Sequence, residues 1–531
     1  MPGVQAAWPS INRAPLPPTL PSPRPLGKRP EQTCPPLPDL WERGWGRGLP
    51  PPPDPWARDQ SEPAPLSQTL GQETRANLPP SPRPFGRETR ANLPPSPRPF
   101  GQETRADLPP SPRPLGEGLG ERAPKLDKYQ SSSTISPTKL LSMRESTMNK
   151  KIRQQFPMLE ELIYLQAGGT GGIPLVAIEA AHAFLEARKK NPDIEHTWIA
   201  AADKVRSMIA DLLGAKANEI AITTSTTAGM NAIANALDLK EGDNVVIDDL
   251  DHPSNVMIWR ACERQKGIET RTVKSQDGKI PLERFEEAID NRTRLISIAL
   301  VSHQNGYLHD IKALAQLAHS HSAHILTDAV QAVGSIPVNV KEMGIDFLAC
   351  SCYKWLIGPL GLGFLYIDEN LLDRVRPVTA GWMQIENHVT DAAGFEKVEK
   401  CQLFKSAKKF EIGTINWQGI YELKASLEFL NRVGWDKIHR QVLKLTLMTQ
   451  ERLAGLGLRL FTPKGNQSGL VTAFIDQDLG KEIGNALEKQ KIIVKSRPGY
   501  LRVDPHFYNT EKEIDTFTKK LTQHLVKLGA I

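Results

Sequence analysis

Residues 327–367 read TDAVQAVGSIPVNVKEMGIDFLACSCYKWLIGPLGLGFLYI, and this stretch decides the fold. With its immediate flanks it holds three short apolar runs: HILTDAV (324–330), FLACS (347–351) and GFLYID (363–368). None of them alternates cleanly between apolar and polar residues, as a strand with one exposed face would. The stretch therefore predicts strands that are buried on both faces, with Asp328 near the end of one and Lys354 just after another.

The same pattern extends toward the N-terminus. Further runs rich in Ile, Val and Leu are EIAIT (219–223), NVVIDD (244–249) and LISIALVS (295–302). Amphipathic stretches with helical spacing separate several of the runs, for example TTAGMNAIANALDL (226–239) and IKALAQLAHSHSA (311–323). This alternation predicts an α/β fold with a mostly parallel sheet covered on both faces. In such sheets, ligands bind at the carboxyl ends of the strands.

The predicted strand ends carry residue types that together suit one cofactor. Lys354 follows a buried strand, and a buried lysine with a lowered pKa can form a Schiff base with an aldehyde. Asp328 ends another strand, where a carboxylate can keep a pyridine nitrogen protonated. Thr226 and Thr227 stand at a helix start, which suits a phosphate ester, and the ring of His252 can stack on a pyridine. These four tasks all belong to pyridoxal 5'-phosphate.

Several motifs stand in order along the chain. The opening stretch holds Asp-x-x-Gln, Ser-x-x-Lys and Gly-Pro-x-Gly-x-Gly, and Asp-His-Pro-Ser-Asn (251–255), Phe-Glu-Ile-Gly-Thr (410–414) and Phe-Tyr-Asn-Thr (507–510) lie around it. With this order and spacing, about residues 155–525 resemble the class V aminotransferase family of fold-type I pyridoxal-phosphate enzymes. That family includes cysteine desulfurase-like and isopenicillin N epimerase-like proteins. The resemblance implies a large domain with a mostly parallel sheet and a smaller C-terminal α+β domain.

The resemblance also implies roles around the cofactor ring. Lys354 would form the Schiff base and would be the general base that moves the α-proton. Asp328 would pair with the pyridinium nitrogen, Gln331 with the ring hydroxyl oxygen, and His252 would stack on the ring. His303 stands where related sequences carry an Asn near that hydroxyl.

Further roles implied by the resemblance concern the phosphate and the substrate. Thr226, Thr227 and Ser351 would hold the cofactor phosphate, and Thr414 would reach the phosphate of a partner subunit in a homodimer. Arg502 would clamp the carboxylate of an amino acid substrate, a task that suits a bidentate guanidinium.

One departure from the family bears on the reaction. Cysteine desulfurases carry a nucleophilic Cys on a loop before the arginine that corresponds to Arg502, whereas residues 494–502 read VKSRPGYLR. None of the five cysteines lies beyond Cys401. We therefore expect aminotransferase, epimerase or C–S lyase chemistry, with a cysteine desulfurase or selenocysteine lyase that uses no protein persulfide as the alternative. Arg497, within this segment, either binds substrate or braces the turn at Pro498.

Residues 1–150 differ in composition from the rest of the chain. They hold 33 of the 44 prolines, and 20 Lys and Arg against 14 Asp and Glu, whereas the rest holds 46 of each sign. Three near-copies of a 15-residue unit fill residues 71–115. We predict a disordered extension, or translation from a start upstream of Met143 or Met148. The alternative is a ligand for a proline-binding module, attached to a non-catalytic, cofactor-binding scaffold.

The composition also bounds the class of protein. We expect a large cofactor-binding domain over 151–375 and a smaller domain over 376–531. No apolar run approaches the roughly 20 residues that span a bilayer, and five sparse cysteines suit a reducing compartment, so a cytoplasmic protein without a membrane partner is predicted. Because the body is charge-balanced and carries no P-loop, nucleic acid and nucleotides are not expected as ligands.

Two clusters invite other interpretations. His319, His321 and His324 resemble a metal site, but no carboxylate or cysteine accompanies them at ligand spacing, so no metal is predicted. Cys350 and Cys352 are two apart in a predicted strand, where they would face the same side and serve packing rather than redox chemistry.

Overall fold

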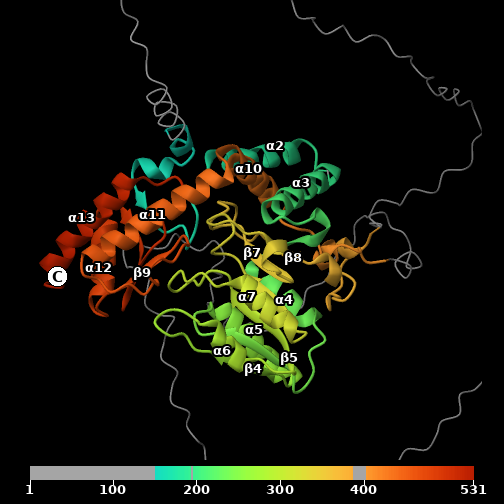
Figure 1. The fold of residues 1–531 in the computed structure, drawn as a ribbon. Coiled ribbons are helices and arrows are strands. Elements are labelled where there is room, and N and C mark those ends of the chain that lie inside the picture. The colour runs from blue at the N-terminus through green and yellow to red at the C-terminus, as the bar shows by residue number, and fades with distance from the viewer. Residues whose placement is uncertain (1–149, 193–194, 387–401) are drawn as a thin grey trace, which may run out of the picture. The chain divides into compact units, whose positions relative to one another are not determined.

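The computed structural model describes residues 150–531, apart from 193–194 and 387–401 (Figure 1). The predicted extension therefore lies, but for its last residue, outside the described residues. In the described part, strands and helices alternate along the chain, which confirms the predicted α/β class. No helix of this part is both long and apolar enough to cross a membrane.

The main sheet has seven strands in the order β2-β8-β7-β6-β5-β3-β4. In chain order their bounds are β2 (Ile220–Thr223), β3 (Asn244–Asp248), β4 (Glu269–Val273), β5 (Thr293–Ala299), β6 (His324–Asp328), β7 (Phe347–Ser351) and β8 (Gly363–Ile367). The pairs from β7 through to β4 are parallel, whereas β8 runs antiparallel to both of its neighbours, β7 and β2. The mostly parallel sheet is thereby confirmed.

Alternate residues of the strands enter two separate cores, which explains why the apolar runs lack polar alternation. In β7, Leu348 and Cys350 belong to one core, and Phe347 and Ala349 belong to the other. The helices that contribute to the first core include α3 (Glu195–Leu213), α6 (Leu282–Ala288) and α7 (Ile311–Ser320). The helices of the second core are α4 (Thr226–Ala236) and α5 (Pro253–Lys266). Cys352 also packs in the first core, beside Cys350.

A smaller antiparallel sheet has the order β11-β12-β9. Its strands are β9 (Val471–Phe474), β11 (Lys495–Arg497) and β12 (Tyr500–Val503), and its helices are α11 (Trp435–Gly455), α12 (Leu479–Lys489) and α13 (Glu511–Lys527). Val471, Leu501 and Val503 share a third core with Phe517 of α13. This sheet and its helices are the smaller α+β part that the resemblance implied.

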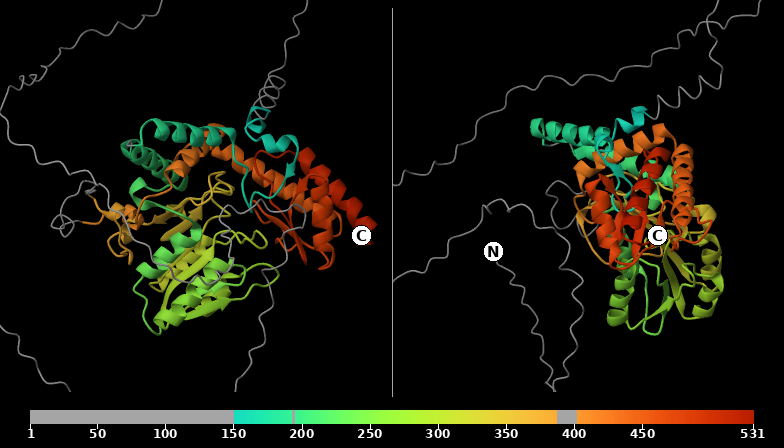
Figure 2. Two further views of the ribbon diagram at one scale, coloured as in Figure 1. Left: turned by 180° about the vertical axis from the view of Figure 1, so that it is seen from behind. Right: turned by 90° about the vertical axis from the view of Figure 1, so that its left-hand side faces the viewer.

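The first elements of the described chain lie against the last ones. β1 (Ile163–Tyr164) pairs in parallel with β10 (Ile492–Ile493). α2 (Leu175–Lys190) and α3 contact α10 (Trp417–Val433), as the green and orange helices show in both views of Figure 2. The division at residue 375 stays a prediction. Short helical turns complete the fold: η1 (Pro157–Glu160), η2 (Ala217–Glu219), α8 (Val340–Met343), η3 (Glu369–Leu371), η4 (Trp382–Gln384) and η5 (Ala407–Phe410).

Candidate active site

Lys354 lies just past the carboxyl end of β7, and its side chain is buried, with 8% of the residue exposed. Burial lowers the pKa of its ammonium group from 10.5 to about 8, and the negative charge of Asp328 opposes that effect. The backbone around it is held tightly, because the amide of Gly171 donates to the carbonyl oxygen of Tyr353 at 2.8 Å. A side chain at Gly171 would collide with the carbonyl oxygen of Lys354, which explains the glycine.

Asp328 ends β6, the parallel neighbour of β7, so the two side chains come from adjacent strand ends. Its Oδ1 accepts a hydrogen bond from the amide of Val330 at 3.0 Å. Burial raises the pKa of this carboxyl, while the amide of Val330 and the charge of Lys354 lower it. A buried carboxylate of this kind fits a protonated ring nitrogen, which would supply a cation in place of the lost water.

Thr226 and Ser351 form a hydroxyl pair where α4 begins. The amide of Thr226 donates to Ser351 Oγ at 2.8 Å, the amide of Ser351 donates to Thr226 Oγ1 at 2.9 Å, and the two hydroxyl oxygens are 3.1 Å apart. Ser225 caps the helix by accepting from the amide of Ala228. The amide of Thr227 has no acceptor among the described residues, and its side chain is exposed. Hydroxyls and a free amide at the start of an 11-residue helix fit a phosphate ester.

Two imidazole rings lie together, close enough to Lys354 and Arg502 for those charges to act on both rings. The rings of His252 and His303 are 4.9 Å apart at 71°. His252 caps α5, and its Nδ1 accepts from the amide of Ser254 at 3.2 Å, which fixes the ring. Burial lowers the pKa of His303 to about 3, helped by the charges of His252, Arg502 and Lys354, so this ring is neutral. Its Nδ1 is buried and has no partner among the described residues.

The side-chain amide of Gln331 already has two partners. Its Nε2 donates to the carbonyl oxygen of Gly168 at 2.8 Å, and its Oε1 accepts from the indole nitrogen of Trp355 at 2.9 Å. Nε2 carries a second hydrogen, which leaves one donor for a ring hydroxyl oxygen. Trp355 and Gly168 were not predicted to hold this amide.

Arg502 lies on β12, with 7% of the residue exposed. Its Nε donates to Asp504 Oδ2 at 3.0 Å, and its Nη1 donates to the carbonyl oxygen of His303 at 2.7 Å. These contacts use the Nε hydrogen and one Nη1 hydrogen, which leaves both Nη2 hydrogens and the other Nη1 hydrogen for a carboxylate. Asp504 is fully buried and escaped the sequence analysis, although its position two residues after Arg502 in an extended segment was a usable signal.

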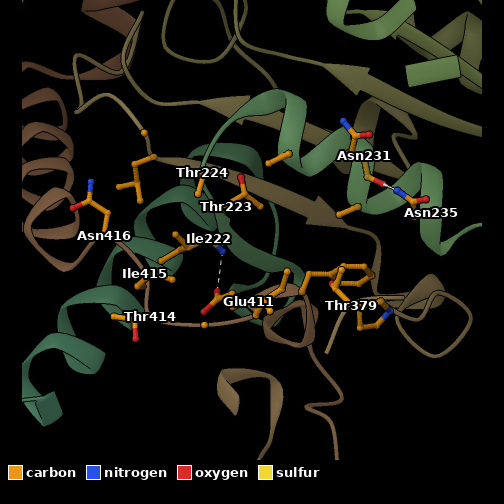
Figure 3. A pocket seen from close by; sticks show the side chains of 18 of the residues that line it. Ile222, Thr223, Thr224, Asn231, Asn235, Thr379, Glu411, Thr414, Ile415 and Asn416 are labelled. Carbon is orange, nitrogen blue, oxygen red and sulfur yellow. Dashed lines mark hydrogen bonds between the residues drawn. The ribbon is translucent and has the colours of Figure 1, made fainter. Parts of the chain in front are cut away.

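Thr414 and Arg497 do not belong to the hydrogen-bond network of this cluster, although the charge of Arg497 acts on His303. Both are exposed, and neither forms a hydrogen bond with Lys354, Asp328 or Arg502 within the described residues. Thr414 lines a cavity of about 370 Å³ (Figure 3). Other residues that line this cavity are Thr223, Thr224, Asn231, Val378 and Ile412. Arg497 lies on β11, directly opposite Tyr500 of β12.

The histidine cluster has a partner that spacing did not predict. His319 Nε2 lies 2.9 Å from Asp346 Oδ2, and His324 Nδ1 lies 3.5 Å from the same oxygen. His321 instead contacts Ser320 and the carbonyl oxygen of Leu317. Within residues 150–531, leaving out the two gaps, no group of three or more His, Cys, Asp or Glu side chains could hold a metal ion.

Comparison with known families agrees with this geometry. The family model described as Aminotransferase class-V matches residues 163–517, about two thirds of the chain. The chain therefore belongs to the class V aminotransferase family of pyridoxal-phosphate-dependent enzymes.

Individual relatives carry names from within this family. An uncharacterized aminotransferase of Bacillus subtilis, YcbU, is 32% identical over 321 residues, which cover 60% of this chain and 83% of the relative. A probable cysteine desulfurase of Methanothermobacter thermautotrophicus is 26% identical over 396 residues, covering 70% of this chain and 97% of the relative. The solved apo structure of a cysteine desulfurase from Thermococcus onnurineus has a TM-score of 0.65 at 26% identity, covering 71% and 98% of the two chains.

Proposed function

We propose that this chain binds pyridoxal phosphate at Lys354 and acts on an amino acid. One observation carries the proposal above all: a buried lysine whose pKa is about 8 stands beside a buried carboxylate, that of Asp328, at the next strand end. A lysine with a pKa of about 8 has a substantial neutral fraction at physiological pH, and the neutral amine is a nucleophile toward an aldehyde. When bound, the cofactor supplies that aldehyde and a conjugated ring that withdraws electrons from a bond at Cα.

Different residues of the chain would then bind the cofactor and transfer the proton. Thr226, Ser351 and the free amide of Thr227 would hold the phosphate, and Asp328 would hold a proton on the ring nitrogen. Lys354 Nζ would take a proton from the substrate Cα and return one, because burial keeps its pKa low enough to exchange protons. We propose that His252 stacks on the ring, and that Gln331 and His303 lie beside the ring hydroxyl.

Arg502 would bind the α-carboxylate through its free Nη edge, and Asp504 and the carbonyl oxygen of His303 would fix the plane of the guanidinium. Arg497 lies on the neighbouring strand as the second substrate-binding candidate. A guanidinium held at two points loses little rotamer entropy on binding a carboxylate.

For the reaction, we propose aminotransferase, epimerase or C–S lyase chemistry. The cysteines of the described residues are Cys262, Cys350 and Cys352; all are buried, and burial raises the pKa of each thiol. Such thiols are poor nucleophiles. The names of the desulfurase relatives support the alternative of a cysteine desulfurase. In that alternative, or in a selenocysteine lyase, an external thiol would accept the sulfur or selenium in place of a protein cysteine.

The test is a substrate screen of the purified holoenzyme in which the products are identified. A keto acid that keeps the substrate side chain indicates transamination, and an inverted stereocentre indicates epimerisation. Sulfide with pyruvate and ammonia indicates C–S cleavage by elimination, and alanine with sulfur captured by an added thiol indicates desulfuration. Wild-type protein should be yellow, and Lys354→Ala should lose the covalently attached cofactor after borohydride reduction, as measured by the mass of the chain. A colourless wild type that cannot be loaded with cofactor would rule the proposal out, whereas a yellow protein that converts no amino acid would favour the cofactor-binding scaffold.

We further propose a homodimer in which Thr414 serves the partner subunit's site. The cavity at Thr414 is bordered by the exposed apolar side chains of Val378 (69% exposed) and Ile412 (45%), which a second copy would cover (Figure 3). Co-expression of Lys354→Ala with Thr414→Glu tests this. Mixed dimers regain one intact site if Thr414 acts across the interface, and regain none if it acts within its own subunit. A cytoplasmic location remains part of the proposal.

A further inference from the structure

The face of the smaller sheet that lies away from its core carries a group of cations. On β11 and β12, Lys495 is directly opposite Arg502, and Arg497 is directly opposite Tyr500. Residues that are opposite in an antiparallel pair share a face, and so do residues two apart along a strand. Lys495, Arg497 and Arg502 therefore share one face, whereas Leu501 of the other face is in the core.

This cationic face is joined to the candidate active site at two points. Arg502 Nη1 donates to the carbonyl oxygen of His303 at 2.7 Å. Thr472, which is opposite Arg502 on β9, donates through Oγ1 to the carbonyl oxygen of Gln304 at 2.7 Å. Lys495 and Arg497 consequently lie beside the arginine that would clamp the substrate, on the strand next to it.

The negative charge of Asp504 acts on Lys495, but this carboxylate is already paired with Arg502. Neither Lys495 nor Arg497 forms an ion pair with a carboxylate of the described residues. Burial lowers the pKa of Lys495, and repulsion from Arg497 and Arg502 lowers it further. Three neighbouring cations that share one carboxylate bind a further anion readily, because binding relieves their remaining repulsion.

We propose that the substrate is an amino acid with a second carboxylate on its side chain, which binds to Lys495 and Arg497 while Arg502 holds the α-carboxylate. This inference rests on the proposed function, and it narrows the substrate class. Lys495 is half-buried and Arg497 is exposed, so the second acid group lies on the solvent side of the clamp.

Two inhibitors of equal carbon number test the proposal on the holoenzyme. Succinate has two carboxylates and butyrate has one, and neither has the amino group that reaction requires. Calorimetric titration should show succinate binding at least about tenfold more tightly than butyrate. Lys495→Gln with Arg497→Gln should remove this preference and leave butyrate affinity unchanged. Lys489→Gln, an exposed cation in the last turn of α12, is the matched control and should keep the preference.

The single variant Arg497→Gln changes an exposed residue. It should reduce the preference for succinate over butyrate from about tenfold to about threefold, which is half of the effect on a logarithmic scale. Equal affinities in the wild type, or a preference that survives in the double variant, would overturn the proposal. The absorbance of the bound cofactor separates the two hypotheses. If it is present while the affinities are equal, only the second-anion site is wrong; if it is absent from the wild type, the proposed function itself is wrong.

Discussion

Lys354 is subject to two opposing effects, and their balance sets its chemistry. Burial disfavours the ammonium form, whereas the carboxylate of Asp328 favours it, and the result is a pKa of about 8. A fully exposed lysine would be almost entirely protonated at neutral pH and unable to attack an aldehyde. The position of Lys354, buried beside Asp328 at the ends of β6 and β7, thus makes its amine reactive.

The pH dependence of cofactor attachment should reveal this lowered pKa. Because the folded pKa lies below the usual 10.5, the neutral amine becomes the main form as pH rises through about 8. The rate at which the apoprotein attaches pyridoxal phosphate should rise about tenfold per pH unit below 8 and level off above it. Absorbance of the attached cofactor, followed after mixing, measures this rate.

Asp328→Asn provides the comparison for that profile. Asp328 raises the pKa of Lys354, so its removal should move the rise in rate to lower pH. The ionisation of the cofactor itself is common to both proteins and does not affect the difference. A rate that keeps rising until pH 10 in the wild type would contradict the lowered pKa.

For single residues, the sequence predicted which side chains lie near strand ends better than it predicted which side chains they contact. Asp328 and Lys354 could be found because two-sided burial of short strands leaves a recognisable pattern. The spacing of Asp504, two residues after Arg502, could have suggested their pairing, but the burial of Asp504 could not be predicted in the same way. Asp504 reaches its buried position through an isolated bridge to Gln166, more than three hundred residues earlier in the chain. Such pairings depend on tertiary packing and leave no local periodicity.

Among the elements, η5 and the loop after it depend on one buried ion pair. Glu411 accepts from Arg206 Nε at 3.0 Å, lies 2.5 Å from Arg206 Nη2, and accepts from the amide of Ile222 at 2.8 Å (Figure 3). These contacts attach the loop that ends at Thr414 to both α3 and β2. Both charged side chains are at most 4% exposed, so each relies on the other.

Glu411→Gln should therefore destabilise the protein markedly. It leaves the buried Arg206 with only the half-exposed Asp203 as a charge partner, and breaking a buried pair costs up to about 3–5 kcal/mol of the free energy of unfolding. Urea unfolding followed by circular dichroism measures the change.

Glu186→Gln is the matched control for that variant. Glu186 forms an ion pair with Lys189 in which both side chains are at least 60% exposed, so its loss should cost at most about 0.5 kcal/mol. Equal losses from the two variants would show that burial does not set the strength of the Arg206–Glu411 pair.

On the scale of the whole molecule, the first described residues support the last helix. Ile152 is buried in the main core, and Arg153 donates to the carbonyl oxygen of Tyr508 at 2.8 Å and lies 3.0 Å from Glu513 Oε1. Stability should therefore depend on residues just before Phe156. We expect no such dependence on the proline-rich repeats, whose composition cannot form a core.

Two truncations should separate these regions. A protein that starts at Met143 should keep the unfolding midpoint and the cofactor absorbance of the full chain. A protein that starts at Phe156 loses Ile152 and Arg153 and should be less stable by about 2–4 kcal/mol. Thermal unfolding of the full chain and the two truncated proteins measures their stabilities. A large loss of stability in the protein that starts at Met143 would contradict a disordered extension.

The pairing of β1 with β10 also constrains how the protein is made. Residues 163–164 leave the ribosome early, yet their strand partners, residues 492–493, are translated more than three hundred residues later. At about 5–20 residues per second, β1 waits at least about 15 seconds for its partner. During that time the nascent chain exposes apolar surface, which is a state that chaperones bind. A stop codon anywhere before residue 492 would leave β1 permanently unpaired, so β1 can pair only after translation has passed β10.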